Sequence, residues 1–165
     1  MQRLRNTLLT LLMVALAATM TACGGGGGDD PQLTPEEERL LALAGSTGTT
    51  WNAVGVTFDS APDDRFDNFS LTLRGTDPEA VLNYSSQNGD PVFKPSGTWE
   101  ITGVSSTTTT IIIDSNTNNV FTISNLNTSV TPATMTITVD FTSGGGVAAG
   151  SSGTDGRYVF NMQAQ

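Results

Sequence analysis

The chain lacks several residue types on which common active sites depend. Its 165 residues include no histidine and a single cysteine, and seven basic residues stand against sixteen acidic ones. Without histidine there is no Ser-His-Asp triad and no histidine-ligated metal, and one cysteine allows no internal disulfide. So few cations also argue against a protein that follows the phosphates of nucleic acid. The length allows one ordinary domain with extensions.

Residues 1–22 have the pattern of a secretory signal peptide. Arg3 and Arg5 form a positive start, and residues 8–18 form an apolar stretch too short to span a bilayer. The segment Met20-Thr-Ala-Cys23 then resembles the lipobox of bacterial lipoproteins. This resemblance implies cleavage before Cys23 and acylation (palmitate-type chains) of that residue, which leaves no free thiol. The alternative is a plain signal peptide followed by an incidental cysteine.

Residues 23–33 are predicted to be a lipidated cysteine and an acidic tether. Loss of Arg3 and Arg5 leaves five basic and sixteen acidic residues, a net charge of −11, so we expect attachment to a membrane through acyl chains and not through charge. Five glycines, residues 24–28, form a flexible leash of roughly 12 Å. Asp29 and Asp30 resemble the surface-export signal of some Gram-negative lipoproteins, which implies the outer membrane and its exposed face. A solvated linker is the simpler alternative.

Residues 34–45 carry the signals of a short helix. Thr34 and Glu37 form a capping box, and Pro35 suits the first helical position. A helix of this length is marginal alone, so it should dock on an open end of the following domain. The apolar stripe that would dock consists of Leu40, Leu41, Leu43 and Ala44.

Residues 46–165 have the alternating pattern of antiparallel β-strands. Phe69-Ser-Leu-Thr-Leu73 and Met135-Thr-Ile-Thr-Val-Asp-Phe141 alternate apolar and polar side chains, which gives each strand one buried and one wet face. Threonine, present 26 times, suits the wet faces. The predicted strands are 49–58, 69–73, 80–84, 97–103, 109–114, 119–125, 135–141 and 156–163. Short connections without crossover helices predict an all-β fold, a small antiparallel up-and-down β-barrel of about eight strands.

A set of motifs in a characteristic order resembles the bacterial lipocalin-like domain of small secreted lipoproteins. The resemblance covers residues 43–163 and implies a lipocalin-like barrel with a helix near its N-terminus. The motifs are Leu43-Ala-Gly45, Gly48-Thr-Thr-Trp51-Asn-Ala-Val54, Phe66-Asp-Asn-Phe69-Ser-Leu71-Thr-Leu73, Gly89, Pro95-Ser-Gly97-Thr-Trp99-Glu-Ile101, Phe121-Thr-Ile123-Ser-Asn-Leu126, Met135-Thr-Ile137 and Gly156-Arg-Tyr158-Val-Phe160.

The candidate ligand-binding residues are Trp51, Phe69, Tyr84 and Trp99, which carry large ring side chains. Binding inside a barrel predicts a cavity of roughly 300 Å³ or more, lined by apolar groups with a few polar ones. Under the alternative interpretation, the same aromatic residues pack as core and fill the interior of a small barrel. Asn83, Tyr84, Asn88 and Trp99 are also of the residue types that hold sugars.

Other candidates for chemistry are weak. The densest carboxylate group consists of Asp59, Asp63, Asp64 and Asp67, but its spacing selects no acid and base pair, and a solvated loop explains it better. Asp114, Asn116 and Asn118 match the start of an EF-hand loop that lacks the glycine and final glutamate, so a hairpin turn is favoured over calcium. Asp63, Asp64 and Asp67 are a second, similarly weak calcium candidate. We therefore expect no metal, no cofactor and no enzymatic activity.

The sequence thus favours an outer-membrane-anchored lipoprotein, lipocalin-like and non-enzymatic, that binds a small apolar or amphipathic ligand. The alternative is a structural or accessory subunit that docks onto an outer-membrane transport or adhesion complex. A large internal cavity favours the first hypothesis, and an exposed apolar patch favours the second.

Overall fold

The computed structural model describes residues 32–143 and 154–165. The predicted signal peptide, the lipidation of Cys23, the acidic pair after it and the glycine-rich turn at 144–146 lie outside the described residues. Within the described ranges, no helix has the length and apolar character needed to cross a membrane.

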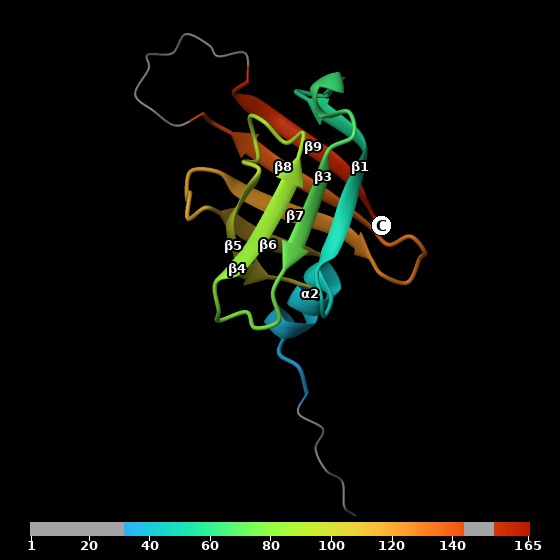
Figure 1. Cartoon of the computed structure of the whole chain (residues 1–165), viewed down its shortest axis with the longest axis vertical. Coiled ribbons are helices and arrows are strands. Elements are labelled where there is room, and N and C mark those ends of the chain that lie inside the picture. The colour runs from blue at the N-terminus through green and yellow to red at the C-terminus, as the bar shows by residue number, and fades with distance from the viewer. Residues whose placement is uncertain (1–31, 144–153) are drawn as a thin grey trace, which may run out of the picture. The chain divides into compact units, whose positions relative to one another are not determined.

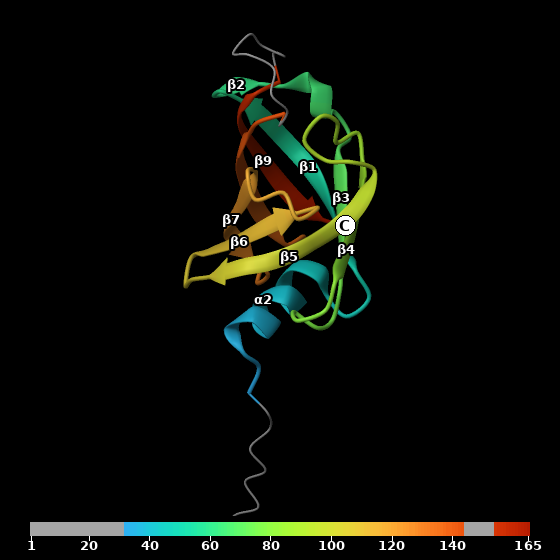
Figure 2. The same ribbon diagram turned by 90° about the vertical axis from the view of Figure 1, so that its left-hand side faces the viewer.

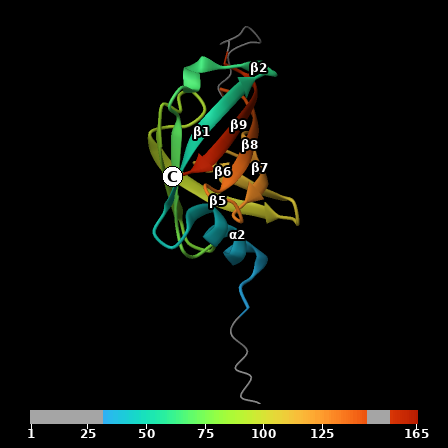
Figure 3. The same cartoon turned by 90° about the vertical axis from the view of Figure 1, so that its right-hand side faces the viewer.

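The fold is a closed barrel of eight antiparallel strands with one short helix (Figure 1). The strands follow one another in space as in sequence, and β1 pairs with β9 to close the barrel, as Figure 3 shows. The elements are α2 (Pro35–Ala44), β1 (Thr49–Phe58), β2 (Ala61–Pro62), η1 (Asp64–Phe66), β3 (Ser70–Arg74), β4 (Leu82–Gln87), β5 (Ser96–Val104), β6 (Thr108–Ile113), β7 (Val120–Asn127), β8 (Thr134–Phe141) and β9 (Gly156–Ala164). The two-residue β2 pairs antiparallel with the end of β1 and is not one of the eight barrel strands. The predicted all-β barrel with a short N-terminal helix is confirmed.

Alternation along β8 places its apolar side chains inside the barrel and its threonines toward the outside. In β8, Met135, Ile137 and Val139 are buried, while the threonines between them are partly exposed. The neighbouring strands bury their apolar residues on the same face as β8. Ile137 pairs with Ile123 of β7 on one side and with Phe160 of β9 on the other. A shift by one residue would turn every apolar side chain outward, so the pattern fixes both the pairing and the face that is buried.

The helix α2 lies at one end of the barrel, where Figure 2 shows β5 passing over it. Its N-terminus has the predicted capping box: Thr34 Oγ1 accepts from the Glu37 N–H, and a Glu37 carboxylate oxygen accepts from the Thr34 N–H. Leu40 and Leu43 are buried against the barrel. The indole N–H of Trp51 donates to the Leu43 carbonyl at 2.8 Å, which satisfies a carbonyl at the helix end and joins α2 to β1.

Two details differ from the sequence-based expectation. Leu41, predicted to dock with the rest of its stripe, is 53% exposed and lies on the outer side of α2. The strand predicted at 80–84 instead spans Leu82–Gln87. Ala80 and Val81, which fall in the predicted range, lie outside the strand, and Val81 is 75% exposed. Local composition therefore identified this strand but not its start.

Aromatic side chains fill the interior at the end away from α2. Phe93, from the loop between β4 and β5, stacks on Phe69 with ring centroids 5.0 Å apart and lies 5.2 Å from Phe121. Phe66 of η1 contacts Phe160 edge to face at 5.0 Å. All of these rings are buried, so the space that a large internal ligand would need is occupied by protein side chains.

Candidate functional site

The four residues predicted to bind ligand are core residues in this structure. Trp51 and Phe69 are fully buried, and Tyr84 and Trp99 are 2% exposed. The Trp99 indole N–H donates to the carbonyls of Arg74 (3.2 Å) and Asn83 (3.1 Å), just as the Trp51 indole is bonded to the helix. Both indole N–H groups thus already have protein acceptors, and packing in the core accounts for the buried position of the rings. Ligand contact by these residues stays a prediction, and it would require the core to open.

A cleft of about 210 Å³ lies at the end of the barrel opposite α2. We call it the mouth cleft. Its wall comes from the β4–β5 loop, the β6–β7 turn and the ends of β6, β7 and β8. Its apolar lining consists of Pro91, Val92, Ile113, Phe121 and Phe141, and its polar lining of Lys94, Asp114, Asn116, Asn119, Thr142 and Ser143. An apolar floor with a few convergent polar groups is typical of small-molecule sites, and barrel mouths commonly hold them.

Asp114 is the centre of the polar side of the mouth cleft. One carboxylate oxygen accepts from the Thr98 N–H at 3.0 Å, and the other accepts from the Tyr84 hydroxyl at 3.2 Å. Lys94 Nζ lies 3.0 Å from that second oxygen. A Cβ on Gly97 would collide with the carboxylate, so glycine at this position makes room for it. Asp114 thus joins the start of β5 to the end of β6 and holds the Lys94 amine at the rim.

The surroundings of Asp114 shift two pKa values in opposite directions. Burial disfavours the charged carboxylate, but the bonds from Lys94 and the Thr98 N–H outweigh it, so the pKa of Asp114 lies below its ordinary value. Burial and the nearby carboxylate raise the pKa of Tyr84 above its ordinary value. Around neutral pH, Asp114 is therefore ionised, Tyr84 is a neutral donor, and the cleft presents a paired cation and anion.

Asn119 forms the opposite wall of the mouth cleft. Its side chain is buried, donates to the Thr142 carbonyl at 3.1 Å and accepts from the Thr142 N–H at 2.9 Å. This pair of bonds fastens the β6–β7 turn to the residue that follows β8. The turn at 114–119, favoured from sequence over a calcium loop, is found between β6 and β7. Its first residue, Asp114, has the protein partners described above.

The acidic group at 59–67 has structural partners. Asp63 caps η1 and forms a two-oxygen ion pair with Arg65 at 2.7–3.2 Å, and the bond from Arg65 lowers the pKa of Asp63. The Arg65 guanidinium also lies over the rings of Phe58 and Tyr158, 5.2 and 5.8 Å from their centroids. Asp59 accepts from the Arg157 N–H. Asp64 and Asp67 are exposed. The sequence favoured a solvated loop here, but Asp63, with a side chain 7% exposed, is paired with Arg65.

The four residues whose types are common in sugar-binding sites do not lie on one exposed face. Tyr84 and Trp99 are buried, whereas Asn83 and Asn88 are exposed. The Asn88 amide donates to the carbonyls of Asp67 and Asn68 and so joins two loops. The aromatic faces needed for stacking are therefore not available beside these amides.

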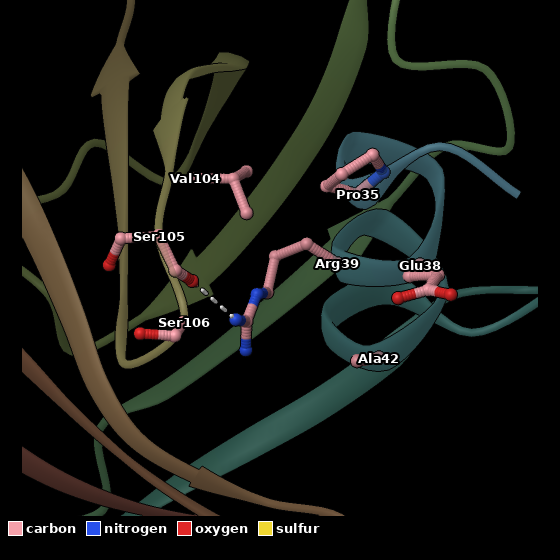
Figure 4. A pocket seen from close by; sticks show the side chains of 7 residues that line it. All are labelled: Pro35, Glu38, Arg39, Ala42, Val104, Ser105 and Ser106. Carbon is pink, nitrogen blue, oxygen red and sulfur yellow. Dashed lines mark hydrogen bonds between the residues drawn. The ribbon is translucent and has the colours of Figure 1, made fainter.

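Two further hollows flank α2. The larger, about 560 Å³, lies between the helix and the β5–β6 hairpin (Figure 4). There Arg39 reaches across to donate to the Ser105 carbonyl at 3.1 Å, while Pro35 and Val104 face each other over the gap. The second, about 260 Å³, lies on the other flank beside the β3–β4 connection.

The sequence did not single out Val92, Lys94 or Asn119 as site residues. Lys94 stands in a loop between two turn signals, and nothing in its neighbours predicts that it meets Asp114, twenty positions along the chain. One signal in the sequence could have pointed to this site. Asp114 directly follows an apolar run at a turn, and a carboxylate that is buried there would need hydrogen-bond partners.

Comparison of the chain with protein-family models, with curated proteins and with solved structures finds no match.

Proposed function

We propose that this chain is a non-enzymatic, lipocalin-like lipoprotein, anchored to the outer membrane through acylated Cys23, which binds a small amphipathic ligand in the mouth cleft. The observation that carries the proposal is the combination of an apolar floor and a paired Lys94 and Asp114 at the barrel end away from the helix. The described chain begins beside α2, at the end of the barrel opposite this cleft.

The size of the cleft limits the ligand. About 210 Å³ is below the roughly 300–1,000 Å³ typical of drug-sized ligand sites. We therefore expect a molecule smaller than the lipids held inside large barrels, or one that is only partly enclosed. Its apolar part would cover Phe121 and Phe141, and its polar part would bond the Lys94 amine at the rim.

The pairing of ionisable groups supports binding over catalysis. Catalysis needs a nucleophile or base held ready to act on a substrate. In the cleft the Asp114 carboxylate has donors on both oxygens, and Tyr84 stays protonated. These groups hold the rim in shape.

The ligand is tested on protein purified from membranes in mild detergent and measured by native mass spectrometry. We expect the wild-type protein to carry a small-molecule adduct, and Val92→Trp, which fills the cleft, to lose it. The matched control is Val130→Trp, an exposed valine in the β7–β8 connection at the other end, which should keep the adduct. An adduct of equal intensity in both variants would place the ligand elsewhere.

The anchor is tested separately on the same material. Intact mass should show a chain that begins at Cys23 with added acyl groups, and Cys23→Ser should remain unacylated and leave the membrane fraction. Protease treatment of intact cells then tests surface exposure. Survival of the protein until the outer membrane is permeabilised would place it on the inner side.

A further inference from the structure

The mouth cleft offers free hydrogen-bond donors from two side chains. The Lys94 ammonium carries three N–H groups, and its contact with Asp114 at 3.0 Å engages only one side of it. The Lys94 side chain is 73% exposed, so its remaining donors stay accessible at the rim. Asn116 lines the same cleft and is half-buried. Both side chains therefore present N–H groups to a molecule in the cleft.

Asn116 is the more selective of these two donors. Its side-chain oxygen accepts from the Asn118 N–H at 3.1 Å, which assigns the oxygen to the turn and leaves the NH2 group for another partner. Among the described residues, no acceptor is bonded to that NH2 group. Polar groups that are withdrawn from water normally have a partner, and the acceptor of a ligand would supply one here.

Two of the strongest acceptors in the cleft are already engaged. Both oxygens of Asp114 have donors, as described above. The Asn119 side-chain oxygen accepts from the Thr142 N–H at 2.9 Å. A ligand that only donates hydrogen bonds would compete with the bonds that hold the rim in shape. A ligand that accepts hydrogen bonds would use the donors that are free.

The lining of the mouth cleft is electrically neutral. Lys94 and Asp114 are its two ionisable residues, and they neutralise each other. An anion would have to draw the amine away from its carboxylate, and a cation would meet that amine at the rim. A neutral acceptor can bond the free N–H groups and leave the ion pair in place.

Charged residues beside the lining disfavour an anion further. The Asp155 carboxylate accepts from the Ser143 N–H at 2.9 Å and adds negative charge next to the cleft. Asp90 and Asp140 each stand next to a lining residue in the chain, and Asp140 is paired with Arg157 at 3.8 Å. These three carboxylates are not among the lining residues, so a cation held by them would stay outside the cleft.

We propose that the ligand of the mouth cleft is an uncharged molecule with a carbonyl oxygen on an apolar body, such as a small amide or ester. The carbonyl oxygen accepts from the Asn116 NH2 group and the Lys94 amine, and the apolar body covers Phe121 and Phe141. This assignment rests on the proposed function, because it concerns the same site. It adds the charge and the hydrogen-bonding group of the ligand.

Three probes of similar shape separate the possible charges: phenylacetamide, phenylacetate and 2-phenylethylammonium. Each is offered to full-length protein purified from membranes in mild detergent, and equilibrium dialysis measures the bound probe. The signal of Val92→Trp protein in the same detergent is subtracted, because its cleft is filled while uptake by the detergent is unchanged. We expect phenylacetamide to bind at least about tenfold more tightly than either charged probe.

Asn116→Asp tests the amide donor directly. The substituted carboxylate still accepts from the Asn118 N–H and keeps the turn, but an acceptor replaces the free NH2 group. We expect the affinity for phenylacetamide to fall about tenfold and that for 2-phenylethylammonium to rise. The matched control is Asn118→Asp, which adds the same charge to the same turn at an exposed residue outside the lining. It should leave the affinity for phenylacetamide unchanged, and thermal unfolding checks that all variants stay folded.

The assignment is overturned if a charged probe binds as tightly as phenylacetamide, if Asn116→Asp binds the amide like wild type, or if Asn118→Asp loses as much affinity. It is also overturned if no probe is bound above the level of Val92→Trp. The adduct seen by native mass spectrometry decides on the proposed function separately. An adduct that depends on the cleft but is a charged molecule refutes the assignment and leaves the proposed function standing.

Discussion

The two ends of the barrel are closed by different means. At one end the helix α2 lays Leu40 and Leu43 on the core and accepts a hydrogen bond from Trp51. At the other end no α-helix lies among the described residues, and single aromatic residues from the short 3-10 helix η1 and from the β4–β5 loop turn inward. The start of α2 depends on signals between neighbouring residues, and its docking depends on contacts with β1, β3 and β5. The mouth end depends on contacts between residues far apart in the chain.

This difference also separates the hollows at the two ends. The mouth cleft is built on the aromatic packing, with an ion pair on its rim. The hollow of about 260 Å³ beside α2 lies on a helix with a capping box, and its lining residue Leu41 is 53% exposed. Changes at the mouth should therefore affect stability and binding together, whereas changes at Leu41 should have little effect on stability.

The largest expected effect is on the mouth end. Phe93→Ala removes a buried ring that contacts Phe69, Phe121 and Phe160, and should lower the free energy of unfolding by about 3–5 kcal/mol. Urea denaturation followed by tryptophan fluorescence measures it. A loss below about 1 kcal/mol would mean that the loop is not part of the core and that the interior is less filled than described.

At the helical end, Trp51→Phe keeps most of the apolar surface but removes the indole donor. The buried Leu43 carbonyl then loses its side-chain partner, and we expect a loss of about 2 kcal/mol. Hydrogen exchange should show faster opening of α2 than of β7 and β8. If all elements open equally, the bond does not serve the helix in particular.

The ion pair of the mouth cleft should be visible in the pH dependence of stability. The folded pKa of Asp114 lies below its unfolded value of about 3.9, so its contribution is present above that value and is lost as pH falls through the folded pKa. Asp114→Asn should cost about 1–2 kcal/mol at neutral pH and progressively less in acid. Urea unfolding of both proteins from pH 7 down to pH 2 measures the difference, and a constant gap would contradict it.

The smallest expected effect is at the start of α2. Thr34→Ala removes one half of the capping box and should cost about 1 kcal/mol, because the Glu37 N–H loses its acceptor. The comparison change Thr142→Ala removes only a longer hydroxyl bond to Asn119, at 3.3 Å, while the two backbone bonds to Asn119 remain, so it should cost less. Equal costs for the two variants would show that the cap is not what holds the helix.

Local patterns predicted the elements well and the site poorly. The alternation at 135–141 predicted β8, and the capping box predicted the start of α2, because each signal acts between near neighbours. The predicted start of β4 was two residues early, since an apolar residue beside a turn, such as Val81, has the same local pattern whether it is buried or exposed. Phe93 and Lys94 follow each other in one loop, yet the first is buried and the second is 73% exposed. Only their contacts with Phe69, Phe121 and Asp114 distinguish them.

The sequence by itself determined a helix followed by eight strands, the faces that these strands bury, and the absence of histidine and disulfide chemistry. Those features follow from composition and from patterns of period 2 and 3.6, which act locally. The tertiary structure decided that the barrel interior is filled, that the ring residues expected to bind ligand are core, and that Lys94 meets Asp114. These outcomes depend on how side chains from different strands and loops pack inside the closed barrel. Local sequence patterns do not determine that packing, because the residues in contact are far apart in the chain.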